Sequence, residues 1–303
     1  MKNIKDVLLI HGLAEEKLLE LQDASVNLVI TSPPYSNQRK NSYGGTSANR
    51  YVEWFLPISA ELFRVLKDDG SLIINIKEHV ENGERSTYVI EMILEMRKQG
   101  WLWVEEYCWY KKTAFPGKWP NRFRDSFERC LHFTKNKKFY MDQNAVKVPI
   151  GDWSHKRFKS MYRGDYVKRA SQNNSHLTRQ VSNWLDRQTV FPHNVIVLDE
   201  EHYPTNVLEI SPVTSNKNHS ACFPIELPSW FILLFSKSGD TVLDPFSGIG
   251  TTGMASMLLK RSFVGIEKER TYVDIAEANI ENLKQTIKVK ETVQSRRTPK
   301  KKM

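Results

Sequence analysis

The chain has 303 residues, of which 40% are hydrophobic and 26% charged, and these values are typical of a globular protein with a full core. No apolar run reaches the length of a membrane span and the N-terminus lacks a signal peptide, so we expect a cytoplasmic protein without a membrane partner. The three cysteines form no close pair and no even set, which argues against both a disulfide scaffold and a cysteine-based metal site.

The N-terminal third alternates strand and helix patterns. The predicted elements are strands at 7–10, 26–30, 71–76 and 101–110, and helices at 51–66 and 88–96. Phe55, Leu62 and Leu66 lie on one stripe at helical spacing, and Asp69-Gly70 is expected to end that helix. Strands that alternate with helices predict a mostly parallel sheet.

The motif Ser32-Pro33-Pro34-Tyr35 follows the second predicted strand. Its two prolines fix the backbone and remove two amide donors, so the loop is rigid and its carbonyl oxygens remain free to accept hydrogen bonds. Ser32 and the Pro33 carbonyl can accept the two hydrogens of an exocyclic amino group, and Tyr35 offers a flat face for stacking. A proline-stiffened turn without chemistry is the alternative for such a motif on its own.

The middle of the chain is strongly basic and loses regular periodicity. Residues 111–179 contain 17 Lys and Arg against five Asp and Glu, and one strand is predicted at 129–134. Basic residues neutralise phosphates, and the interleaved aromatic residues can stack on bases. The alternative is a solvated basic face. Lys118, Arg122, Arg124 and Arg129 form a cluster, and the nearby Asp125 and Glu128 suggest that some of its charges form internal ion pairs. The candidate phosphate or nucleic-acid contacts are Lys118, Arg122, Arg124, Lys156, Arg157 and Arg163 in this region, together with Arg39, Lys40 and Arg50 after the Ser-Pro-Pro-Tyr motif.

Regular patterns return in the C-terminal third. The predicted elements are helices at 224–236, 251–259 and 271–283 and strands at 241–243 and 263–266. With the N-terminal elements they predict an α/β fold with a doubly wound, mostly parallel sheet, interrupted by the basic region.

A glycine-rich turn, Gly248-Ile249-Gly250-Thr251-Thr252-Gly253, follows the strand at 241–243. It fits a dinucleotide-binding pattern, so an NAD-type oxidoreductase is one alternative. Asp244 argues against it, because a carboxylate at this strand end would repel a pyrophosphate. A ligand with cationic groups fits better, and S-adenosylmethionine carries an ammonium and a sulfonium. Glu267, at the end of the next strand, can accept hydrogen bonds from a ribose diol.

Together, the Ser-Pro-Pro-Tyr motif and Asp244-Pro245-Phe246-Ser247-Gly248-Ile249-Gly250-Thr251-Thr252 resemble the catalytic and cofactor motifs of amino-methylating DNA methyltransferases. Their order, catalytic motif first, is that of the β group. The resemblance implies a permuted S-adenosylmethionine-dependent methyltransferase fold and assigns catalysis to Ser32, Pro33, Pro34 and Tyr35. The cofactor contacts that it implies are Thr31, His219, Phe223, Pro224, Asp244, Pro245, Phe246, Gly248, Gly250, Thr251 and Glu267.

The resemblance also implies a domain organisation and partners. The expected parts are a catalytic half (1–135), a target-recognition region inserted in the sheet (136–212), a cofactor-binding half (213–287) and a basic disordered tail (288–303). The expected substrate is double-stranded DNA from which the target base is flipped. A restriction-modification system in the prokaryotic cytoplasm adds a separate endonuclease. Homodimers are common in the β group, but the sequence locates no interface.

In this family, Ser before the prolines goes more often with cytosine N4, and Asp or Asn with adenine N6. The resemblance therefore favours cytosine N4, with adenine N6 as the alternative. An RNA or protein amide methyltransferase and an inactive DNA-binding module are further alternatives. The sequence departs from the family at His11-Gly12-Leu13, where an acidic residue commonly approaches the cofactor adenine, and Glu15 or Glu16 is only a loose substitute.

Overall fold

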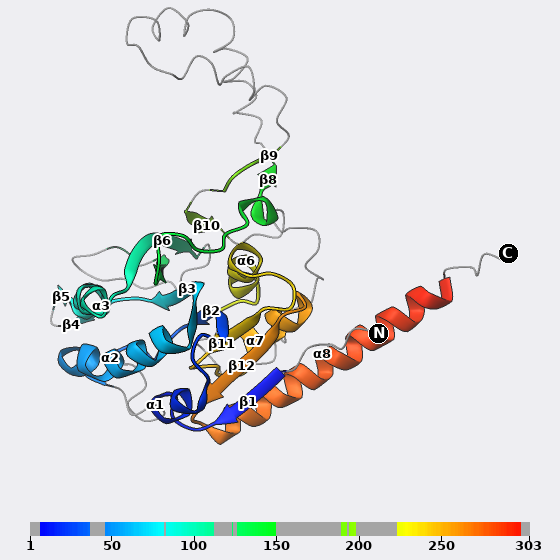
Figure 1. Ribbon diagram of the computed structural model, residues 1–303, viewed down its shortest axis with the longest axis horizontal. Coiled ribbons are helices and arrows are strands. Elements are labelled where there is room, and N and C mark those ends of the chain that lie inside the picture. The colour runs from blue at the N-terminus through cyan, green and yellow to red at the C-terminus, as the bar shows by residue number, and fades with distance from the viewer. Residues whose placement is uncertain are drawn as a thin grey trace, which may run out of the picture.

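The computed structural model describes residues 7–36, 46–81, 83–111, 123, 126–149, 189–192, 194–197 and 223–297, with the side chains of the last helix described to residue 287. Its centre is an eight-stranded sheet in the order β1-β12-β11-β2-β3-β7-β6-β10 (Figure 1). The strands are β1 Val7–His11, β2 Val26–Thr31, β3 Leu66–Ile76, β6 Leu102–Tyr110, β7 Phe127–Thr134, β10 Val195–Val197, β11 Thr241–Asp244 and β12 Ser262–Glu267. β7 is antiparallel to both of its neighbours, and the other described pairs are parallel.

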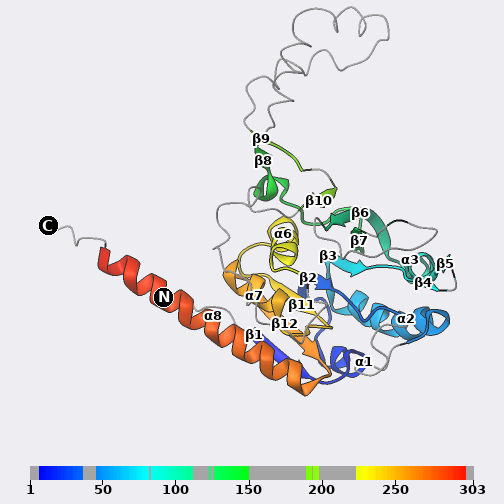
Figure 2. The ribbon, with the colours of Figure 1, turned by 180° about the vertical axis from the view of Figure 1, so that it is seen from behind.

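Helices cover both faces of this sheet (Figures 1 and 2). The helices are α1 Ala14–Lys17, α2 Ala48–Val65, α3 Tyr88–Lys98, α6 Glu226–Phe235, α7 Thr251–Leu258 and α8 Arg270–Arg297, with single 3-10 turns at Leu18–Glu20 and Gln143–Val146. One apolar core joins α1, α2 and α3 to the sheet, and a second core lies under α6 and α7 on the opposite face. The predicted doubly wound architecture is therefore confirmed.

β2 and β11 are neighbours at the centre of the sheet, and Leu243 lies opposite Val29. The chain leaves β2 through α2 toward β3, and leaves β11 through α7 toward β12 on the other side. Connections that depart in opposite directions open a crevice beyond the carboxyl ends of two adjacent strands, where doubly wound proteins bind ligands.

Asp69-Gly70 does not end α2, contrary to the sequence-based expectation. The helix ends at Val65, and Leu66–Ile76 is continuous strand. Gly70 lies in that strand, where a Cβ would come within 2.7 Å of a Leu66 side-chain carbon and 2.8 Å of the Asn27 carbonyl oxygen. The glycine is therefore required by the close approach of β2 and β3, where their pairing register shifts.

Two further regions differ from the sequence-based expectation. α8 continues to Arg297, so residues 288–297 are helical and the expected disordered tail is wrong there (Figure 1). β10 adds a strand to the sheet from within the region assigned to target recognition. Two small antiparallel sheets pair β4 Val80–Glu81 with β5 Glu84–Arg85, and β8 Val148–Pro149 with β9 Thr189–Val190. In the described part of the chain, no helix combines the length and apolar character of a membrane span.

His132 gives the fold a pH-dependent stability. It is 1% exposed on β7, its Nε2 lies 3.0 Å from the Ser71 hydroxyl, and its ring lies 4.4 Å from that of Phe235. Burial lowers the pKa of His132 from 6.5 to about 3. Between these pH values the unfolded chain binds a proton that the folded protein does not, so stability falls as pH falls below 6.5.

Urea unfolding is expected to show the His132 contribution falling by roughly 2 kcal/mol between pH 6.5 and pH 5, at about 1.4 kcal/mol per pH unit. His132→Gln retains a partner for Ser71 but cannot titrate in this range, so its stability should depend less on pH. Equal pH slopes for the two proteins would contradict this account.

Candidate active site

The two sequence motifs meet at the carboxyl ends of the central strands. Thr31 ends β2 and Asp244 ends β11, and the Thr31 hydroxyl donates a 2.8 Å hydrogen bond to the Asp244 Oδ1 atom. Both side chains are buried. This bond joins residues 213 positions apart in the sequence, and it brings the starts of the two loops together.

Asp244 stabilises the glycine-rich turn that follows it. Its carboxylate accepts a 2.7 Å hydrogen bond from the Thr252 hydroxyl and a 3.1 Å bond from the Phe246 amide, in addition to the bond from Thr31. Burial raises the pKa of Asp244 to about 6, although these donors oppose the shift. Asp244 is therefore ionised at neutral pH and keeps a negative charge under the turn.

The turn between β11 and α7 depends on two glycines. Gly248 and Gly250 have φ values of +53° and +85°, in the left-handed region that favours glycine. Gly250 immediately precedes α7, and a Cβ there would lie 3.0 Å from that of Ala276. A Cβ on Gly248 would meet no atom within 4 Å among the described residues, so the backbone there faces open space.

Glu267, at the end of β12, is 4% exposed. Its carboxylate accepts 2.9 Å hydrogen bonds from the amides of Gly248 and Glu269. Burial raises the pKa of Glu267, and the backbone donors act against it. The turn is thus held by the carboxylates of Asp244 and Glu267. Each carboxylate oxygen can accept more than one hydrogen bond.

The Ser-Pro-Pro-Tyr loop continues from β2. Pro33 is buried, whereas Ser32, Pro34 and Tyr35 are partly exposed. The Tyr35 hydroxyl lies 2.8 Å from the Glu128 carboxylate and 3.3 Å from the Asn75 side-chain oxygen. Neither Asn75 nor Glu128 lies near the motif in the sequence. No role was therefore expected for Asn75, and Glu128 was expected only to take part in a structural ion pair.

An aromatic contact connects the glycine-rich turn after β11 to α2. The rings of Trp54 and Phe246 have centroids 5.8 Å apart, and the Trp54 indole donates a 2.6 Å hydrogen bond to Glu15. Glu15, the loose substitute for the acidic residue of the family, is therefore engaged by Trp54. The amphipathic pattern of α2 places Trp54 beside its buried face but does not reveal this contact.

Phe223 and Pro224 precede α6, and Phe223 packs against the second core. Arg50 lies in the first turn of α2 with a side chain that is 78% exposed, 3.8 Å from an equally exposed Glu53. The other predicted contacts are outside the described residues: Arg39, Lys40, Lys118, Arg122, Arg124, Lys156, Arg157, Arg163 and His219.

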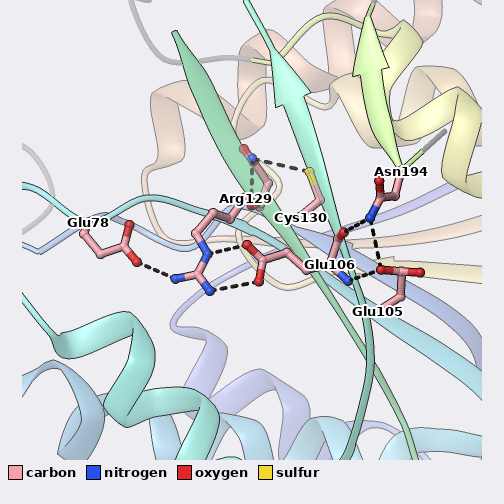
Figure 3. Close-up of polar contacts among 7 residues, drawn as sticks. Glu78, Glu105, Glu106, Arg129, Cys130 and Asn194 are labelled. Atoms are coloured by element: carbon pink, nitrogen blue, oxygen red, sulfur yellow. Dashed lines mark hydrogen bonds and ion pairs between the residues drawn. The ribbon is translucent and has the colours of Figure 1, made fainter. Parts of the chain in front are cut away.

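Arg129 forms internal ion pairs with Glu78 and Glu106 and is not a free surface charge (Figure 3). Its guanidinium forms 2.7 and 2.9 Å hydrogen bonds to the two oxygens of Glu106 and also bonds Glu78. Its side chain is 14% exposed, and those of Glu78 and Glu106 are 9% and 34% exposed. The expectation that part of the basic cluster is structural holds for this residue.

Arg129→Met is expected to lower the free energy of unfolding by about 2–3 kcal/mol, because two carboxylates lose their partner. The loss is smaller than for a fully buried pair because Glu106 is one-third exposed. Lys98→Met is the matched control, since its pair with Glu95 is exposed and contributes under about 0.5 kcal/mol. Urea unfolding at pH 7 measures both, and equal losses would contradict the assignment.

A doubly wound sheet with one reversed strand and a glycine-rich turn at its switch point is the fold of the S-adenosylmethionine-dependent methyltransferase class. The DNA methylase family model (N6_N4_Mtase) matches residues 26–278, and the chain belongs to this family of DNA amino-methyltransferases. The family expected from the two motifs is thereby confirmed, as is its restriction-modification type.

Individual relatives agree with this assignment. The chain is 27% identical to the Type II methyltransferase M.PvuII of Proteus hauseri, over 85% of this chain and 79% of the relative. The solved structure of the PvuII DNA methyltransferase (cytosine-N4-specific) aligns with a TM-score of 0.62 at 23% identity, covering 91% and 90% of the two chains. TTHA0409 of Thermus thermophilus, complexed with S-adenosyl-L-methionine, aligns with a TM-score of 0.56 at 21% identity, covering 91% and 94%.

Proposed function

We propose that this protein transfers a methyl group from S-adenosylmethionine to the N4 amine of a flipped cytosine in double-stranded DNA. The observation that carries the proposal is the Thr31–Asp244 hydrogen bond, because it brings the amine-binding loop and the cofactor turn to one crevice. A methyl donor and an acceptor must lie within about 3–3.5 Å of each other to react, and adjacent strand ends meet that need.

The turn after β11 is suited to S-adenosylmethionine. Open space over Gly248 leaves room for a ligand against the backbone, and the amides that begin α7 point toward the same turn. Asp244 supplies a fixed negative charge for the cationic end, and Glu267 is placed to accept hydrogen bonds from ribose hydroxyls. When bound, the cofactor supplies an electrophilic methyl group on a sulfonium.

In the proposed reaction, the Ser32 hydroxyl oxygen and the Pro33 carbonyl accept the two hydrogens of the target amine. This holds the amine lone pair away from the ring and toward the methyl group. The N–C bond forms as the S–C bond breaks, so S-adenosylhomocysteine leaves with the electron pair of that bond, and the methylated amine releases its extra proton to solvent. The rigid Pro33-Pro34 backbone holds both acceptors in place, and Tyr35 stacks on the base.

Cytosine N4 is favoured by Ser32 and by a relative whose structure is described as cytosine-N4-specific. DNA binds mainly to the basic region 111–179, because the segments that carry the two motifs are mildly acidic. A separate restriction endonuclease and a cytoplasmic location are part of the same proposal, as relatives named Type II methyltransferases suggest.

The proposal is tested by incubating the full chain with radiolabelled S-adenosylmethionine and duplex DNA of mixed sequence, and in parallel with RNA and with protein, followed by digestion and identification of the labelled nucleoside or amino acid. Label in N4-methylcytosine is the expected result. Label in N6-methyladenine would overturn the choice of base but keep the reaction. Label only in RNA or protein would overturn the substrate, and no label in any would overturn the enzymatic activity.

A further inference from the structure

Glu128 lies on β7 at the edge of the sheet that carries the catalytic loop. β7 is antiparallel, so its first residues lie beside the carboxyl ends of the parallel strands, with Arg129 opposite Ile76 of β3. Glu128 is 8% exposed and accepts the 2.8 Å hydrogen bond from Tyr35. A carboxylate buried at this place requires compensation.

Lys111 provides that compensation. Its ammonium contacts the other carboxylate oxygen of Glu128 and lies 4.7 Å above the ring of Trp109. The backbone amide of Lys111 also donates a 2.7 Å hydrogen bond to the Ser126 carbonyl. Lys111 is thus held by three different contacts, which fixes the place of the Glu128 carboxylate.

The contacts of Tyr35 define the direction of its hydroxyl. Glu128 and the Asn75 oxygen both act as acceptors, so the single Tyr35 hydrogen points toward β7 and β3. Burial and the Glu128 charge raise the pKa of Tyr35 well above its ordinary value, and a contact from the Ser32 hydroxyl opposes the shift. Tyr35 therefore stays protonated and keeps its hydrogen for the Glu128 carboxylate.

We propose that Glu128, neutralised by Lys111, is a positioning residue that fixes the Tyr35 hydroxyl and, with it, the Tyr35 ring that stacks on the target base. This inference rests on the proposed function. The Tyr35 hydroxyl is held by Glu128 and Asn75, so the ring keeps one place beside the loop that accepts the target amine. The positioning chain runs from Lys111 through Glu128 to Tyr35.

The test is a double-mutant cycle on methyl transfer. Tyr35→Phe removes only the hydroxyl, and Glu128→Gln removes only the charge. Each is expected to lower kcat about 10- to 100-fold, the scale of a small misplacement of reacting groups, with cofactor affinity unchanged. Since both changes break one chain, the double variant should be no slower than the slower single variant.

Glu106→Gln is the matched control, because Glu106 is also a carboxylate paired with a cation at this sheet edge but contacts Arg129. Its kcat should remain within about twofold of wild type, measured below the unfolding temperature. If Glu128→Gln does not fold, Lys111→Met with Glu128→Gln removes both charges and should retain the kcat loss.

Additive losses in the cycle, or a full kcat in a folded Glu128→Gln protein, would overturn the positioning role while methyl transfer by the wild type stands. A wild-type protein that transfers no methyl group would instead overturn the proposed function and this inference with it.

Discussion

Ser32→Ala is expected to lower kcat for methyl transfer about 10²- to 10³-fold, the cost of losing one preorganised group that stabilises the transition state. The alanine leaves only the Pro33 carbonyl to accept from the amine, so the lone pair stays conjugated with the ring. Ser32 is partly exposed and lies beyond the end of β2, so the fold should not change. Initial rates on duplex DNA with saturating cofactor measure the effect.

Ser36→Ala is the control on the same loop. Its hydroxyl is buried and has no hydrogen-bond partner among the described residues, so its loss should leave kcat nearly unchanged. The Ser32 variant should bind S-adenosylmethionine as tightly as wild type by calorimetry. A Ser32→Ala protein with full kcat would remove Ser32 from the reaction.

Asp244→Asn is expected to weaken S-adenosylmethionine binding about 10- to 150-fold, which corresponds to the roughly 1.5–3 kcal/mol of interactions with a charged group. The amide keeps the size of the side chain and one acceptor, but it removes the charge beneath the turn. The Thr31 and Thr252 hydroxyls can rotate to accept from the new amide. The substitution therefore changes the charge beneath the turn more than the conformation of the turn. Calorimetric titration with the cofactor gives the affinity.

The wild-type affinity should also depend on pH. Because the pKa of Asp244 is about 6 in the free protein and a cationic ligand favours the ionised form, affinity should fall as pH decreases through 6, by up to about tenfold per unit. Asp244→Asn should lack this dependence. Asp240→Asn is the control, because it removes the same charge beside Lys237 just before β11 begins. It should bind S-adenosylmethionine with the wild-type affinity at each pH.

Much of the fold follows from local patterns. β2 and β11 are short apolar runs, and the carboxyl ends of parallel strands share one edge, so the meeting of Thr31 and Asp244 was predictable. The end of α2 was not, because Asp69-Gly70 has the composition of a turn although strand pairing decides its conformation. β10 is too short to show a periodic pattern of apolar residues. Its pairing with β6 depends on contacts between segments far apart in the sequence.

The site was predicted only where its residues lie in motifs. Glu128 reaches Tyr35 from a strand 93 positions away, and Trp54 reaches Phe246 from a helix. Such contacts depend on tertiary packing, which no spacing in the sequence records. The assignment of contacts with DNA within the basic region 111–179 remains a prediction.

β1 and β2 follow each other in the chain, yet β12 and β11 lie between them in the sheet. A nascent chain that has emerged only as far as β10 therefore lacks the two strands that lie between β1 and β2, and the edge of β2 that faces β11 is unpaired. The strand that closes the gap beside β2 is also the strand that carries Asp244. Completion of the sheet and assembly of the whole site are consequently one late event, because the loop after β2 has no turn beside it until β11 is added.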